Sequence, residues 1–215
     1  LPMLIGNVLQ QFYNLTDAWV VGRFGGKEAL AAVGSSFSIV FLLIALVLGV
    51  TMGAGIMVSQ FYGARDMARV KRTISTAYWY VLVASVILTG LGLLLSRPLL
   101  ALLRTPADVM PQAVTYLNII FAGTVLSFGY NALSAVLRAL GDSRTPLYFL
   151  AIAVTVNVGL DLWFVMGLGW GVAGAAWATV ISQGVAFLAS FAYMQRCRHE
   201  VPVLKSPFPA EGAAG

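Results

Sequence analysis

The sequence predicts an all-α, polytopic membrane protein. Of its 215 residues, 60% are hydrophobic and only 10% are charged, a composition too apolar for a water-soluble domain of this size. The charges divide the chain into runs that match the hydrocarbon core of a bilayer, for which a helix needs about 20 residues. Residues 73–96 and 109–137, for example, carry no charge. Strands of a membrane barrel would instead alternate in polarity, and these runs do not.

The first three predicted helices cover about 1–21, 29–62 and 73–96. The first ends at the glycine-rich turn GRFGGK. The second run is too long for one straight span and too short for two with a loop. We therefore expect one long helix, tilted or bent at the glycines of GVTMGAG (49–55). The basic connector RDMARVKR separates it from the third helix.

Three further helices, at about 112–137, 146–166 and 172–194, complete a six-helix lobe over 1–200. Pro146 suits the first turn of the fifth helix, where its missing N–H is not needed. Residues 201–215 contain three prolines and no apolar run, which indicates a cytoplasmic linker or a cut end. The chain opens at Leu1 within an apolar stretch, so we expect its first helix to lack part of its beginning.

Basic residues set the expected orientation. Six spans place both ends on one side, and that side holds nine lysines and arginines against four on the other. Such residues concentrate on the cytoplasmic side. We therefore expect a multi-pass protein of the cytoplasmic membrane with both ends in the cytoplasm. The charges lie at helix ends rather than on a soluble face, which argues against nucleic acid as a partner. The single cysteine, Cys197, excludes an intrachain disulfide.

Asp161 is the main candidate functional residue, because it is the only charge in the fifth span. A lone aspartate there costs roughly 2.5–3.5 kcal/mol on insertion scales. Asn157 lies one turn earlier on the same helix face. The other acidic residue inside an apolar run is Asp17, in the first span. Both helices run outward with the aspartate near the outer end, so we expect the two carboxylates to meet.

A polar stripe leads along the first helix to Asp17. Its members recur at spacings of three and four, and they are Gln10, Tyr13, Asn14 and Asp17. Such a stripe faces protein or water rather than lipid. Two carboxylates in a low-dielectric site cannot both stay ionised unless a proton or a cation such as Na⁺ joins them. Asn157 and Thr179 are candidate oxygen ligands. The alternative is that each aspartate only caps a helix end.

Four ordered segments of the chain resemble the multidrug and toxic compound extrusion (MATE) family of secondary transporters. They are QQFYNLTDAWVVGRFGGKEALAAVG at 10–34, SQFYGARD at 59–66, VLRALGDSRTP at 136–146 and NVGLDLWFVMGLGWGVAGAAWATVISQ at 157–183. The resemblance implies two six-helix lobes around a central cavity, of which this chain matches the N-terminal one. The implied partners are small organic substrates, membrane lipids, and a missing C-terminal lobe or a second copy.

The resemblance also implies a site and an activity. In the branch that includes the DNA-damage-inducible F proteins, the N-lobe cation-coupling site matches Asp17, Asn157, Asp161 and Thr179, with Tyr13 beside it and Gln10 and Asn14 as supporting residues. The implied function is a cation-coupled antiporter, driven by H⁺ or Na⁺, that exports organic and often cationic drugs and toxic compounds. It is not an enzyme, and it needs no cofactor besides the coupling ion.

Two alternatives remain open. A lipid-linked oligosaccharide flippase of the same superfamily shares the lobe architecture, but its cavity would be expected to carry several cationic residues, and these spans have none. An intramembrane aspartyl protease also needs two membrane aspartates on separate helices. It expects a Gly-x-Gly-Asp run, whereas this chain has Val-Gly-Leu-Asp at 158–161.

Overall fold

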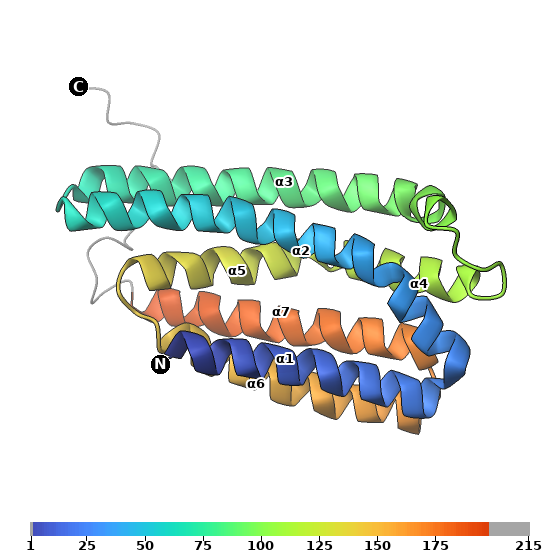
Figure 1. Ribbon diagram of the computed structural model, residues 1–215. Coiled ribbons are helices and arrows are strands. Elements are labelled where there is room, and N and C mark those ends of the chain that lie inside the picture. Colours follow the sequence, from blue (N-terminus) through green and yellow to red (C-terminus); the bar gives the residue numbers. More distant parts are fainter. Residues whose placement is uncertain (1, 198–215) are drawn as a thin grey trace.

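The computed structural model describes residues 2–197, apart from a few side chains that include those of Asn14 and Cys197. Within these residues the regular structure is helical throughout, and the expected all-α membrane class is confirmed (Figure 1). The elements are α1 (Pro2–Val20), η1 (Val21–Gly25), α2 (Gly26–Gly63), α3 (Met67–Leu102), α4 (Met110–Ala122), α5 (Thr124–Ala139), α6 (Thr145–Asp161), η2 (Leu162–Gly167) and α7 (Gly171–Cys197). The predicted segment at 201–215 lies outside the described residues.

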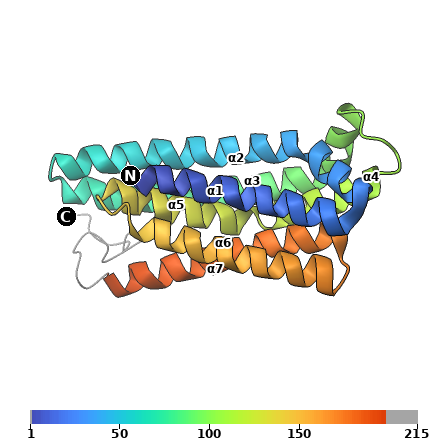
Figure 2. The same ribbon diagram turned by 60° about the horizontal axis from the view of Figure 1, so that its bottom comes forward.

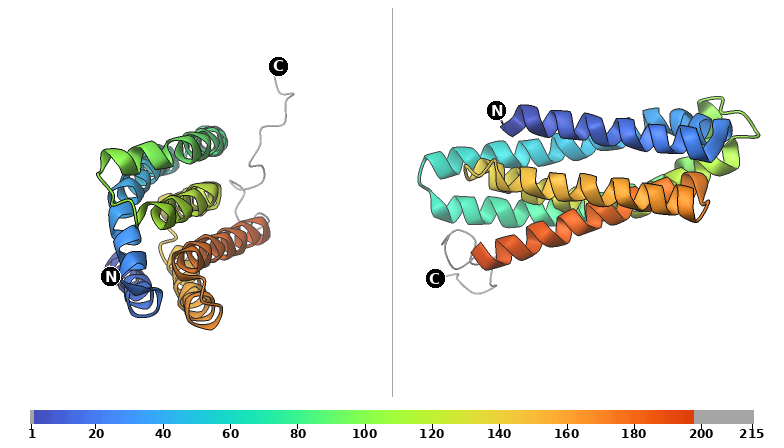
Figure 3. Two further views of the ribbon diagram at one scale, coloured as in Figure 1. Left: turned by 90° about the vertical axis from the view of Figure 1, so that its right-hand side faces the viewer. Right: turned by 90° about the horizontal axis from the view of Figure 1, so that it is seen from below.

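The helices lie side by side along one direction (Figures 1 and 2). The long pair α2 and α3 packs on α5, which packs in turn on α7, while α6 packs on α7 and α1 on α6. The end-on view shows α1 at the edge of the bundle beside α6 (Figure 3). The wide helical turn η1 joins α1 to α2. Among the described residues, α1 is therefore held chiefly by α6 and by its own connection.

Four helical segments are long and apolar enough to cross a membrane: α2, α3, α6 with η2, and α7. Helices α4 and α5 form a fifth when taken as one bent span. Helix α1 has 19 residues and carries the polar stripe. The four segments, the bent α4–α5 pair and α1 make six segments within the described chain, each running between the two ends of the bundle, as expected for one lobe.

The predicted fourth span consists of two helices, α4 and α5, which meet at Gly123 with a bend of 46°. A Cβ atom at position 123 would overlap the side chain of Val180 in α7. Only glycine lets α7 approach the bend this closely. The sequence predicted one continuous helix here because its apolar run is unbroken, and one glycine does not reveal the neighbouring helix.

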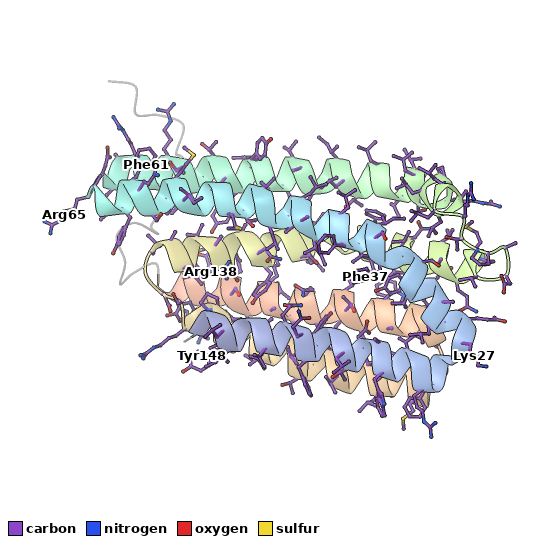
Figure 4. All side chains as sticks on the ribbon, viewed as in Figure 1. Lys27, Phe37, Phe61, Arg65, Arg138 and Tyr148 are labelled. Carbon is purple, nitrogen blue, oxygen red and sulfur yellow. The ribbon has the colours of Figure 1, made fainter. Side chains whose placement is uncertain are left out.

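The second predicted helix is one long element, α2, that changes direction in its N-terminal half, near the residue labelled Phe37 (Figures 1 and 4). The segment Gly34, Ser35, Ser36 lies here, and the Ser36 hydroxyl donates to the carbonyl of Ala32 at 2.8 Å. Glycine–serine pairs and such side-chain bonds are common causes of bends. This bend is separate from the one predicted at 49–55.

Two nearby glycines of α3 provide a matched test of the packing. A Cβ at Gly92 would overlap the ring of Phe121 in α4, whereas a Cβ at Gly90 meets nothing within 4 Å. We expect Gly92→Ala to lower the free energy of unfolding by about 1–3 kcal/mol, the usual cost of overpacking. Gly90→Ala should be neutral or stabilising, by up to about 1 kcal/mol. Thermal unfolding of both variants in detergent measures this, and equal stabilities would contradict the α3–α4 contact.

Candidate functional site

Asp17 and Asp161 face each other between α1 and α6. Asp17 is 9% exposed and Asp161 is fully buried at 0%. Because α1 packs along α6, their carboxyl groups lie within interaction range of one another. Each aspartate lies within one turn of a wide turn that ends its helix, η1 after α1 and η2 after α6. The structure therefore brings together the two carboxylates that the sequence predicted to meet.

These carboxylates lack ordinary hydrogen-bond partners. Within the described residues, both carboxyl oxygens of Asp161 and one of Asp17 are buried without a donor. Asn157 is 0% exposed, and neither its amide nitrogen nor its amide oxygen has a partner there. A buried polar atom without a partner costs about 1–3 kcal/mol. A proton, a small cation or a water molecule bound among these oxygens would supply the missing partners.

The wall of the site comes from α7 and α4. The buried hydroxyl of Tyr13 points toward Thr179 and Ser182 of α7 without a hydrogen bond of normal geometry. Tyr116 of α4 is 7% exposed and lies within electrostatic range of both aspartates and Tyr13. The sequence singled out neither Ser182 nor Tyr116 as a site residue. A tyrosine or a serine in an apolar span is common, and only the fold, which packs α4 against α7 beside the two aspartates, places these two residues here.

Of the two supporting residues predicted from the stripe, Gln10 lies outside this cluster. Gln10 is exposed on the surface of α1. The side chain of Asn14 is not among those described. The stripe therefore follows the border of the packed face of α1, and Tyr13 and Asp17 are its members shown to be buried.

The donor set fits a proton or a small hard cation. Carboxylate, amide and hydroxyl oxygens are the ligands that hard cations prefer. Among the residues described, no group of three or more histidine, cysteine, aspartate or glutamate side chains gathers as a metal site. Two carboxylates with neutral oxygens suit a single positive charge, supplied either by H⁺ or by Na⁺. The residues that would hold Na⁺ are Asp17, Asn157, Asp161 and Thr179.

A bundle of membrane-spanning helices with unpartnered carboxylates in its interior is typical of membrane transporters. Comparison with known proteins identifies the family: the chain belongs to the MatE family, whose model matches residues 2–163. Members of this family are transporters and not enzymes, so the protease alternative is excluded.

The chain is similar to the probable multidrug resistance protein YpnP of Bacillus subtilis (strain 168), with 40% identity over 201 residues. That alignment covers 90% of this chain and 44% of YpnP. Crystal structures of MATE in the bent and in the straight conformation both superpose with a TM-score of 0.87, at 29% and 30% identity. They cover 98% of this chain and 47% of each of those chains. The chain spans under half the length of these relatives, which fits one lobe.

Proposed function

We propose that this chain is the N-terminal lobe of an antiporter that exports organic, often cationic, compounds in exchange for H⁺ or Na⁺. The observation that carries the proposal is the buried Asp17–Asp161 pair, in which both carboxyl oxygens of Asp161 and one of Asp17 have no donor among the described residues. Two such carboxylates cannot both remain ionised at close range without a positive charge between them. They bind that charge as one unit. An occupied and an unoccupied pair are therefore two distinct electrostatic states of the lobe.

The ion acts through the packing of α1. Since α6 is the main neighbour of α1, repulsion between two ionised carboxylates pushes α1 from α6. Neutralising the pair lets the two helices close. The ion can shift this equilibrium only by its differential affinity for the two arrangements. The solved structures similar to this chain include MATE in a bent and in a straight conformation, so more than one conformation has been crystallised in this family.

The proposed orientation places the α2–α3 turn and the end of α7 in the cytoplasm. Seven basic residues of the described chain lie at this end, and they are Arg65, Arg69, Lys71, Arg72, Arg138, Arg144 and Arg196. The opposite end holds Arg23, Lys27, Arg97 and Arg104. Figure 4 shows Arg65 and Arg138 at one end of the bundle and Lys27 at the other. The excess marks the cytoplasmic side.

The proposed substrates are organic cations and other small toxic compounds, in line with the name of the similar protein YpnP. Half of the cavity would come from a C-terminal lobe or a second copy of this chain. The flippase alternative is not favoured, because the six predicted spans contain no lysine or arginine that could hold a pyrophosphate within the membrane. Arg69 and Arg72 lie outside these spans, at the surface end of α3.

The test uses the complete protein in membrane vesicles with a fluorescent cationic dye. We expect dye to move only when a gradient of H⁺ or of Na⁺ is imposed, and each ion is tested alone at a fixed concentration of the other. Vesicles without the protein are the control. Equal dye movement with and without both gradients would contradict ion coupling.

A further inference from the structure

A groove of about 700 Å³ lies between α2 and α3, well away from the carboxylate pair. Its volume lies within the roughly 300–1,000 Å³ of small-molecule sites. On the α2 side it is floored by Gly49, Gly53 and Ala54. A Cβ at either glycine would meet nothing within 4 Å, so the missing side chains are what open the groove.

The groove has a basic mouth. Arg69 and Arg72 of α3 lie at the end marked by Phe61 and Arg65 in Figure 4. Arg69 is positioned by Asp66, with 3.2 Å between Nε and a carboxylate oxygen, and its guanidinium lies 5.7 Å from the centre of the Phe61 ring. Among the described residues, Arg72 forms no ion pair that could neutralise it. The mouth therefore carries net positive charge over an apolar floor.

The depth of the groove matches one leaflet of a bilayer. It follows α2 from Phe61 to Gly49, a length of about 18 Å at 1.5 Å per residue. Half of the roughly 30 Å hydrocarbon core is about 15 Å. A ligand with its head at the arginines would place its tail at the glycines, near the middle of the membrane. Thr73 and Thr76 line the groove just below the arginines and offer hydroxyl donors at the level of ester carbonyls.

We propose that this groove binds an anionic phospholipid, with its phosphate on Arg69 and Arg72 and one acyl chain along Gly49 and Gly53. Basic pockets between transmembrane helices are a known way to hold anionic headgroups. The charge of the mouth disfavours the organic cations proposed as transport substrates. The site is independent of the carboxylate pair, so its test does not depend on transport.

The experiment uses the complete protein in phosphatidylcholine vesicles that contain phosphatidylglycerol with a photoreactive acyl chain. Crosslinks are mapped by peptide mass spectrometry. We expect labelling to concentrate on residues 49–57 and 73–81, and Gly53→Leu, which fills the floor, to lower it at least tenfold. Gly90→Leu is the matched control and should leave labelling unchanged, because position 90 is also open but does not line the groove. The double variant Arg69→Gln, Arg72→Gln should remove the preference over a photoreactive phosphatidylcholine.

Several results would overturn the proposal. Equal labelling of wild type and Gly53→Leu would show that the lipid does not occupy the groove. Equal labelling by the two lipids in wild type would show that the arginines do not select an anionic headgroup. An absence of labelling in the complete protein would mean that another part of the transporter, or its substrate, covers this surface.

Discussion

Asp161→Asn is expected to reduce gradient-driven export to the level of vesicles without protein, while the folded protein remains equally abundant. The amide has nearly the same shape as the carboxylate but cannot take up a proton or balance a cation. The two carboxyl oxygens of Asp161 have no donor among the described residues, and an amide at position 161 can still donate to the carboxylate of Asp17 that faces it. Removing a buried charge also removes a desolvation cost, and the thermal stability should be unchanged or raised. Dye transport and unfolding are measured on the same preparation.

Asp66→Asn is the matched control. Its carboxylate pairs with Arg69 at the membrane surface, where such a pair contributes at most about 1 kcal/mol, and transport should be retained. Asp17→Asn should reproduce the loss seen in Asp161→Asn, and the double variant should be no worse, because two groups that bind one charge act as a unit. Retained gradient-driven export by Asp161→Asn would instead make Asp161 a structural residue.

The fold class and the carboxylate pair were accessible from the sequence because charges are rare in it. In a chain with so few of them, each charge either ends a span or needs a special reason to lie within one. Asp17 and Asp161 are the acidic residues that lie within a predicted span instead of ending one. The number of spans makes the first and fifth helices run in the same direction, and each carries its aspartate near the outer end. The two aspartates were therefore expected at the same depth in the membrane, where they could meet.

Features that depend on neighbouring helices were not accessible in this way. Tyr116 joins the site from α4, and Val180 of α7 lies so close to Gly123, at the α4–α5 bend, that a Cβ atom there would overlap it. Helical periodicity reports which residues of one helix share a face, but not which other helix covers that face. The exposure of Gln10 was missed for the same reason: the sequence does not show where the neighbouring helices stop covering α1, and they cover Tyr13 and Asp17 but not Gln10.

The coupling cation is expected to stabilise the wild-type protein in the absence of any substrate or gradient. An ion that binds the folded state alone adds about 2.7 kcal/mol to the free energy of unfolding at 100 times its dissociation constant. If Na⁺ is the ion, raising Na⁺ at constant ionic strength should raise the melting temperature of the purified protein at fixed pH. If H⁺ is the ion, lowering the pH in the absence of Na⁺, within the range where the protein stays folded, should raise the melting temperature.

Asp161→Asn should lose this stabilisation and Asp66→Asn should keep it. The stabilisation by the ion should be largest in α1, because α1 relies on α6 for its packing and the ion removes the repulsion between these two helices. Amide hydrogen exchange along residues 13–20 should therefore slow when the ion is bound, whereas exchange in α3 should not change. If Asp161→Asn were stabilised as much as wild type, the ion would bind elsewhere. The loss of transport in that variant would then have a cause other than coupling.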